Sequence, residues 1–510
     1  MWQRYTFYDL RVIAHYLGVL LVYTGAAMVV PLVTAAASSE WEPAARYLFS
    51  MGIALTVGSA MRMLRIEPGR LNRQQAIAVT SFAWIVVAAI AAIPLALSPH
   101  YQSYLNALFD SVSSFTTTGV TIISNPDHIS NADNMWRFIS VYAGGAGLVV
   151  VAMSFGLFGR VADSSLYESE GRSEHVLPNV VQTARFILRF SLAVIVVASI
   201  VLAAICLLHG MQVPRALLHG FWLAVSGYMT GGLTPMSTSI TYYHSVMVEG
   251  VLMVLMLLGS VSFLLQSEVL RGRVQGYFRD IEVRTAVVWI GIMLTLFIVT
   301  LSSSTLMRSL PELARTGLFT FISAATTTGF STLTSNQLTS IMPSGALLIL
   351  ALVMSVGGAS GSTAGGIKLK NIAIIGKSAF ETLKGVASPD SARVVTTYYH
   401  IGRRCLGAEE VKRAMTVFTI FVIMYIVGAL VGVAHGYDAV SAITESVAMA
   451  SNGGISTGIT QASMPALLKI MYIAEMWAGR LEFITLLAVG VKICASLRPR
   501  GLLGARKGRS

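Results

Sequence analysis

Four short stretches rich in threonine and glycine contain the residues of this chain best suited to bind a ligand. The first is FTTTGVT at residues 115–121, and its three relatives end at Thr234, Ser331 and Ser456. Each has a glycine at the same point, and these glycines recur about every hundred residues: Gly119, Gly232, Gly329 and Gly454. Glycine tolerates positive φ, so successive carbonyls can be aimed the same way. Because rings of backbone carbonyls replace the hydration shell of a monovalent cation, the pattern predicts a cation pore.

Four residues of each stretch are the predicted ion-binding positions, and we call these sets the Thr/Gly loops. They are Thr117, Thr118, Gly119 and Val120; Thr230, Gly231, Gly232 and Leu233; Thr327, Thr328, Gly329 and Phe330; and Asn452, Gly453, Gly454 and Ile455. A single such stretch after an apolar helix is most often a helix C-cap. Four copies at the same position of a long repeat favour a pore. The second and fourth loops depart from the Thr–Thr–Gly pattern, at 229–231 and 452–453, so we expect them to bind ions less tightly.

Each Thr/Gly loop lies inside a repeated unit of elements that would position it. A long apolar helix comes first, at about 73–97, 183–209, 284–304 and 411–434. A segment of about a dozen residues follows, which is too short to cross a bilayer and predicts a re-entrant pore helix. The loop and a second long apolar helix complete the unit. Non-helical backbone at membrane depth is tolerated only where it is buried or lines a wet cavity, so we expect four helix–pore loop–helix units around a central pore.

The composition indicates an all-α polytopic membrane protein. Of its 510 residues 55% are hydrophobic and 12% are charged, with a mean hydropathy of +0.69. A soluble globular protein has about 25% charged residues. Two further helices, at about 11–36 and 44–64, precede the repeats. The first apolar run is too long for a secretory signal, whose apolar region has about 7–15 residues, and is expected to be retained.

The repeats suggest five segments. They are 1–66, with the two N-terminal helices; 67–160, pore unit 1; 161–270, pore unit 2; 271–385, pore unit 3; and 386–510, pore unit 4 with a basic C-terminal tail.

The formal net charge of +12 follows the predicted topology. Lys and Arg cluster in alternate connections, which is the positive-inside bias and predicts that both termini are cytoplasmic. The pattern argues against nucleic-acid binding. The basic segments 368–413 and 492–509 are also possible docking surfaces for a cytoplasmic partner.

A run of small residues at 357–366 interrupts the second helix of the third unit. It contains only Gly, Ala, Ser and Thr. A packing face of small residues is the alternative, but each glycine costs about 1 kcal/mol relative to alanine in a helix. A break is therefore favoured, and we call this segment the intramembrane loop. Its glycines are Gly357, Gly358, Gly361, Gly365 and Gly366.

Three charged residues lie within the apolar segments near the predicted pore. Arg480 falls in the middle of the last predicted long helix, where the insertion of an arginine into the membrane costs roughly 2.5–3.5 kcal/mol. It could face the pore or pair with Glu475 or Glu482. Asp110 and Glu445 occupy the same phase of two pore helices, and we expect them to bond to filter backbone rather than attract cations.

No pattern in the chain indicates enzyme chemistry or a bound cofactor. Cys206, Cys405 and Cys494 are far apart, and the nine histidines show no metal-ligand spacing. Neither a phosphate-binding loop nor a catalytic triad stands out. The chain is therefore not expected to be an enzyme.

The Thr/Gly loops, VGGASGSTAGGIKLKN at 356–371 and AGRLEFITLL at 478–487 resemble the Trk/Ktr/HKT superfamily of potassium transporters. The two extra N-terminal helices are similar to the bacterial TrkH/TrkG branch. The resemblance implies potassium as the transported ion, bound at the Thr/Gly loops, with the intramembrane loop as a gate and Arg480 as a positive constriction. It also implies a homodimer, a cytoplasmic nucleotide-binding TrkA-like subunit and the bacterial inner membrane. A glycine at 119 goes with potassium, whereas serine there goes with sodium in the plant branch.

Two other functional classes fit the sequence less well. A coupled cation symporter, moving potassium or sodium with protons, would use broken helices and a midplane site. The repeats here are parallel and their loops enter from one side, which favours a pore. The lack of clustered acid, base or metal groups disfavours a membrane enzyme. The sequence does not decide between channel-like and coupled flux.

Overall fold

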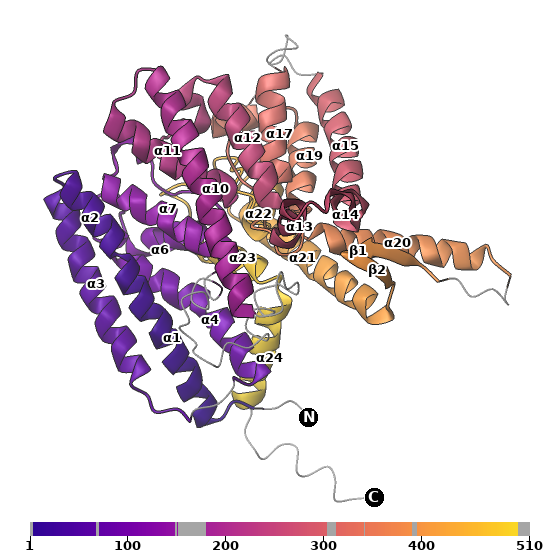
Figure 1. Cartoon of the computed structure of the whole chain (residues 1–510), viewed down its shortest axis with the longest axis horizontal. Helices are drawn as coiled ribbons and strands as arrows, with labels where there is room; N and C mark the ends of the chain where they lie inside the picture. Colours follow the sequence, from indigo (N-terminus) through magenta and orange to yellow (C-terminus); the bar gives the residue numbers. More distant parts are fainter. Residues whose placement is uncertain are drawn as a thin grey trace, which may run out of the picture.

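The computed structural model describes residues 4–67, 71–147, 150, 180–302, 313–340, 342–389 and 395–497. These residues are mostly helical (Figure 1). Within them, five helical stretches are long and apolar enough to cross a membrane: 7–37, 73–96, 181–208, 281–301 and 408–434. The prediction of an all-α polytopic membrane protein is confirmed.

The N-terminal helices form a packed pair at one side of the molecule (Figure 1). They are α1 (Phe7–Ala27), which continues into α2 (Val29–Ala37), and α3 (Trp41–Arg62). Gly18 of α1 and Gly58 of α3 meet where the backbones cross. A Cβ placed on Gly58 would lie 2.9 Å from the carbonyl oxygen of Gly18. Small residues allow this close approach between membrane helices.

The first two repeats begin with long apolar helices and contain the expected half-length helices. Unit 1 has α4 (Arg73–Ala91), α5 (Ile93–Ala96), the pore helix α6 (Tyr104–Phe115), a 3-10 turn at Pro126–His128 and α7 (Asn131–Ala146). Unit 2 has α10 (Val180–Leu208), the pore helix α11 (Val213–Tyr228), a 3-10 turn at Ser239–Tyr243, α12 (Val246–Ser260) and α13 (Phe263–Leu270).

The last two repeats follow the same order. After α14 (Val274–Arg279), unit 3 has α15 (Ile281–Ser302), a π-helical turn at Leu313–Gly317, the pore helix α17 (Leu318–Ala325), α18 (Ser335–Ser340), α19 (Ser344–Ser355) and α20 (Leu369–Val386). The antiparallel hairpin β1 (Thr397–His400) and β2 (Gly402–Cys405) leads to unit 4, with α21 (Ala408–Ala434), the pore helix α22 (Ala439–Ala450), α23 (Ala466–Arg480) and α24 (Ile484–Leu497).

The expectation of a continuous second helix is wrong in the second and fourth units. In unit 2, α12 and α13 are bent by 104°. In unit 3 the chain is irregular between α19 and α20, and in unit 4 Glu482 and Phe483 take positive φ between α23 and α24. In unit 1, α7 ends at Gly147, whose φ is 93°. The break anticipated only in the third unit is therefore also present in the second and fourth units, and most of the chain after Gly147 in unit 1 lies outside the described residues.

Some of the suggested segment boundaries cannot be compared with the structure. The boundary at 160/161 and the basic tail from 498 onward lie outside the described residues. The boundary at 66/67 falls between α3 and α4, and that at 270/271 falls at the end of α13. The boundary at 385/386 falls inside the last turn of α20.

Replacing Gly58 with alanine should destabilise the protein, because the added methyl would collide with the backbone of α1. Overpacking of this kind costs about 1–3 kcal/mol. Gly52 lies on the same helix, and a methyl added there would have nothing within 4 Å. Gly52→Ala is therefore the matched control and should be neutral or slightly stabilising. Thermal unfolding of the purified variants in detergent measures both. Equal melting temperatures would contradict the close contact.

Candidate ion-binding site

The four pore helices all end in the same way. The amide of the second loop residue donates to a carbonyl five residues earlier, from Thr118 to Ser113 at 2.9 Å and from Gly231 to Ser226 at 2.7 Å. Thr328 and Gly453 repeat this bond. Such a bond is typical of a helix ended by a left-handed residue. The C-cap that was the alternative explanation of one stretch is thus the local structure of all four loops.

The backbone of each Thr/Gly loop takes positive φ twice. The first residues have φ of 57° at Thr117, 48° at Thr230, 49° at Thr327 and 53° at Asn452. The glycines two positions later also lie in this region. Left-handed non-glycine residues cost of order 1–3 kcal/mol each and cluster at functional sites. The same strain at four equivalent positions indicates that the fold holds these loops in one shape.

The four loops close into a ring in which each glycine faces the backbone of the next unit. A Cβ on Gly119 would lie 2.2 Å from the carbonyl oxygen of Gly231, in unit 2. A Cβ on Gly232 would lie 2.1 Å from the carbonyl oxygen of Thr328, in unit 3. A Cβ on Gly329 would lie 2.8 Å from the Cα of Gly454, in unit 4. A Cβ on Gly454 would lie 2.1 Å from the carbonyl oxygen of Thr118, in unit 1. The contacts therefore run from unit 1 to 2, 3, 4 and back to 1. Glycine is required sterically as well as for its φ.

The pore helices give the ring a negative electrostatic bias. Four helices end immediately before the loops, at Phe115, Tyr228, Ala325 and Ala450. The C-terminal end of a helix has a partial negative charge of about half an elementary charge. Four such ends at one ring favour a cation and disfavour an anion.

Loop side chains fasten the ring to its surroundings. The hydroxyls of Thr116 and Thr118 lie 2.8 Å apart, and Thr326 and Thr328 repeat this contact. Asn452, the departure from the Thr–Thr–Gly pattern, donates from Nδ2 to the Thr118 hydroxyl at 3.0 Å and to the carbonyl of Met476 at 3.0 Å. The asparagine thus ties unit 4 to unit 1. Weaker ion binding by this loop remains a prediction.

The intramembrane loop lies directly against the ring. The hydroxyl of Thr230 donates to the Thr363 hydroxyl at 3.1 Å, and the Gly365 amide donates to the Thr327 hydroxyl at 2.8 Å. A Cβ on Gly365 would also lie 2.1 Å from the carbonyl oxygen of Ser451. The loop therefore contacts the second, third and fourth units around the ring.

The path of the intramembrane loop depends on its glycines. Gly361 and Gly366 have φ of 71° and 68°. A Cβ on Gly357 would lie 1.7 Å from the carbonyl oxygen of Gly365, and a Cβ on Gly358 would lie 2.6 Å from that of Ser260. A hairpin of backbone this tight has no room for side chains at Gly357 and Gly358.

Arg480 connects the loop to the first unit. It is the last residue of α23, at a helix break, and not in the middle of a long helix as the sequence suggested. Its guanidinium donates to Thr117 Oγ1 at 3.1 Å, to the carbonyl of Thr363 at 2.7 Å and to the carbonyl of Gly144 at 2.8 Å. Glu475, one suggested ion-pair partner, instead accepts the Ser446 hydroxyl at 2.7 Å.

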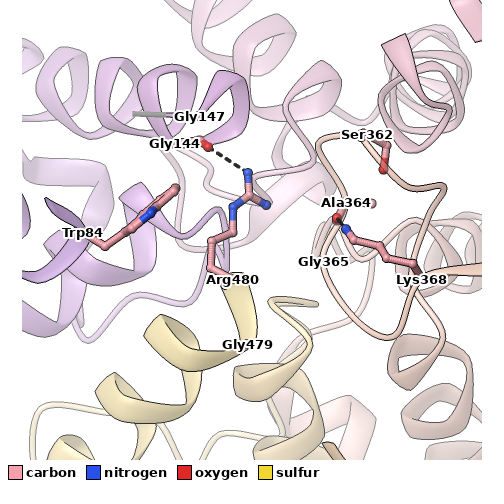
Figure 2. A pocket seen from close by; sticks show the side chains of 10 residues that line it. Trp84, Gly144, Gly147, Ser362, Ala364, Gly365, Lys368, Gly479 and Arg480 are labelled. Atoms are coloured by element: carbon pink, nitrogen blue, oxygen red, sulfur yellow. Dashed lines mark hydrogen bonds between the residues drawn. The ribbon is translucent and has the colours of Figure 1, made fainter. Parts of the chain in front are cut away.

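A small cavity lies between Arg480 and the intramembrane loop (Figure 2). Figure 2 shows Arg480 between Trp84 and the intramembrane loop, with Lys368 across the cavity. The Lys368 ammonium donates to the Ala364 carbonyl at 2.5 Å. Arg480 and Lys368 thus bring two positive charges to the lining of this cavity.

The two pore-helix carboxylates have different roles. Glu445 accepts the Thr457 amide at 2.7 Å and the Ser456 hydroxyl at 2.8 Å, both just after the fourth Thr/Gly loop. Asp110 differs from the expectation, because it accepts Tyr101 Oη at 2.7 Å and Arg137 Nε at 2.9 Å. Both partners are buried, so Asp110 anchors its pore helix through an ion pair.

Sequence reasoning missed a second set of glycines in the repeats. Gly144, Gly259 and Gly479 each face the last carbonyl of their own pore helix. A Cβ added to each would lie 1.7, 2.1 and 1.9 Å from the carbonyl oxygens of Phe115, Tyr228 and Ala450. The signal was present in the chain, since each follows its loop glycine by a nearly constant interval. It was missed because only the Thr/Gly stretches were aligned.

The structure also brings together one group that no sequence spacing revealed. Within the described ranges, one set of three potential metal ligands lies within 4.8 Å: Asp280, Glu282 and His400. It lies between the hairpin and the start of α15, away from the Thr/Gly loops. His400 Nδ1 and Asp280 Oδ2 are 3.0 Å apart, which fits a buried His–Asp hydrogen bond.

Four pore helices, four glycine loops closed into a ring and a broken helix beneath them define a membrane protein with a pore-loop architecture. The sequence profile of the TrkH family, described as cation transport proteins, matches residues 48–496. The chain belongs to the TrkH family of cation transport proteins.

Named relatives align over nearly the whole chain. An uncharacterised cation transporter of Methanocaldococcus jannaschii is 29% identical over 493 residues, covering 95% of this chain and 96% of the relative. The Trk system potassium uptake protein TrkH of Escherichia coli K12 is 27% identical, covering 94% and 98%. The crystal structure of the potassium transporter TrkH from Vibrio parahaemolyticus superimposes with a TM-score of 0.79 at 22% identity, covering 94% and 98%. The resemblance to the TrkH/TrkG branch is confirmed.

Replacing Gly232 with alanine should destabilise the ring beyond the effect of backbone strain. Alanine at positive φ costs about 1 kcal/mol, and collision with Thr328 O adds about 1–3 kcal/mol of overpacking. Gly436 has φ of 88° with open space around it, so Gly436→Ala isolates the strain alone. Thermal unfolding should show a clearly larger loss for Gly232→Ala. Equal decreases in melting temperature for the two variants would contradict a close contact between Gly232 and Thr328.

Proposed function

We propose that the chain takes up potassium across a bacterial cytoplasmic membrane through the ring of Thr/Gly loops. The ion would be stripped of water and bound by loop carbonyls, since such rings replace a cation's hydration shell. The observation that carries this proposal is the closed cycle of backbone contacts from Gly119 through Gly454. A ring built from all four units would place equivalent carbonyls around one axis. The potassium uptake function named for the relatives supports the choice of ion.

The gate of this pore would be the intramembrane loop together with Arg480. The loop contacts units 2, 3 and 4, and Arg480 joins it to Thr117 of unit 1. A positive charge at this point repels a cation leaving the ring. The bonds from Arg480 to the Thr363 and Gly144 carbonyls would hold the gate closed, and opening would require the arginine or the loop to move.

The proposed assembly is a homodimer with a cytoplasmic nucleotide-binding subunit of the TrkA kind. In the orientation predicted from the positive charges, both termini would face the cytoplasm. Figure 1 shows α20 and the β1–β2 hairpin projecting from the body of helices. The end of α20 exposes Phe380, Leu383 and Val386. Exposed apolar side chains on a basic arm suit contact with a second protein chain.

Flux measurements on the purified chain in liposomes test the transport proposal. Under an imposed potential the protein should admit potassium in preference to sodium, and Gly119→Ser should reduce this preference because the added side chain meets the Gly231 carbonyl. Repeating the measurement with and without a pH gradient separates a channel-like pore from a coupled symporter. Absence of potassium flux while another solute moves would refute the proposal.

Replacing Arg480 with glutamine should increase potassium flux. The change removes the positive charge below the ring while retaining hydrogen-bond donors, and each 1.4 kcal/mol taken from a barrier gives about a tenfold higher rate. Arg404→Gln on the exposed hairpin removes the same charge far from the ring and is the control. Flux through both variants is compared in the same liposomes. A flux that is unchanged or lower in Arg480→Gln would contradict a gating role.

A further inference from the structure

A large cavity lies between α15, α20 and the β1–β2 hairpin, away from the ring. Its volume is about 620 Å³, within the range of cavities that hold small organic ligands. The start of α15 forms one wall, and α20 and β1 form the others. Its lining residues are Arg279, Ile281, Arg284, Thr285, Val288, Trp289, Ile292, Ile372, Ala373, Gly376, Lys377, Thr397, Tyr398, Tyr399 and Arg403.

One end of this cavity is strongly basic. Four of the lining residues are cations: Arg279, Arg284, Lys377 and Arg403. None of the lining residues that the structure describes is acidic. Arg284 donates to the carbonyl of Phe278 at 3.2 Å and Lys377 to that of Thr397 at 3.4 Å. The cavity therefore offers a positive field to an anion.

The other end is apolar and continues along a membrane helix. Val288, Trp289 and Ile292 extend it down α15, and at 1.5 Å per residue Ile292 lies roughly 16 Å along the axis from Ile281. Of the five candidate spans, α15 is the least buried, with 11% of its apolar window inside the protein. Val287, Val288 and Ile292 are exposed. The cavity thus opens onto an exposed apolar face of α15.

We propose that this cavity binds an anionic phospholipid. The phosphate would lie among the four cations, and an acyl chain would follow Val288 and Ile292 down α15. Basic pockets at the cytoplasmic ends of membrane helices recognise anionic headgroups in this way. Free inorganic phosphate would satisfy the cations but leave the apolar half unfilled. The site rests on the proposed orientation of the chain and not on the identity of the transported ion.

A lipid in this cavity would hold together the elements that support the gate. Asp280, next to Arg279, bonds to His400 at the end of β1. Glu282, in the first turn of α15, accepts the amide of Ser360 in the intramembrane loop at 2.8 Å. Clamping α15 to the hairpin and α20 therefore fixes the base on which the loop rests. The bound state is expected to be more stable than the lipid-free state.

The test is retention of phosphatidylglycerol by the full chain in nanodiscs that also contain phosphatidylcholine. Native mass spectrometry reports bound lipid, and thermal unfolding reports the stabilisation. The double variant R279Q/R403Q should lose roughly tenfold in affinity for phosphatidylglycerol, because each basic residue near an anionic headgroup contributes severalfold. The exposed pair R62Q/R65Q removes the same charge elsewhere and should retain wild-type binding.

Three results would overturn the lipid site. The first is equal retention of phosphatidylglycerol by the two double variants. The second is stabilisation by inorganic phosphate that is as large as stabilisation by the lipid. The third is that R279Q/R403Q loses a cytoplasmic protein partner while its lipid retention is unchanged. Lipid retention is measured without ion flux. Its failure would leave the potassium proposal intact, and failed potassium flux would leave the lipid result standing.

Discussion

The contact of four glycines with the backbone of neighbouring units is the constraint on which the rest of the structure depends. At three of the four junctions a Cβ added to the glycine would lie only 2.1–2.2 Å from a carbonyl oxygen, so no side chain fits. The loops can meet only if all four pore helices end at the same depth and at the same angle to the ring. The left-handed residue two positions before each glycine and the buried Asp110–Arg137 pair serve this positioning. Such a pair is costly to bury alone and is tolerated because both charges are bonded.

The irregular backbone of the ring must satisfy its own polar groups, since lipid supplies no partners. Loop amides such as those of Thr118 and Gly453 donate to carbonyls five residues earlier, and the Thr457 amide after the fourth loop donates to Glu445. The Asn452 side chain also accounts for one carbonyl, that of Met476. Glycines on α7, α12 and α23 abut the last carbonyls of the pore helices. After the glycine of the second unit the chain bends by 104° between α12 and α13.

Charge is arranged in layers around this framework. Helix C-termini make the ring attractive to cations, whereas Arg480 and Lys368 place positive charge directly beneath it. Further along, the described lining of the α15 cavity holds four cations and no acidic side chain. Asp280, Glu282 and His400 link that cavity to the intramembrane loop. The intramembrane loop and the α15 cavity are thus connected through a few buried bonds.

The sequence by itself determined the class, the repeat and the loops, because apolar length, glycine phase and the run of small residues at 357–366 are local properties. It did not determine which backbone each glycine faces, the partners of Arg480, the role of Asp110 or the meeting of Asp280 with His400. Most of those depend on residues more than a hundred positions apart. It also suggested continuous second helices in the second and fourth units, since apolar residues surround the breaks there. Only the tertiary structure shows these breaks, because the close contacts of Gly259 and Gly479 with the ends of their pore helices join residues that are distant in the chain.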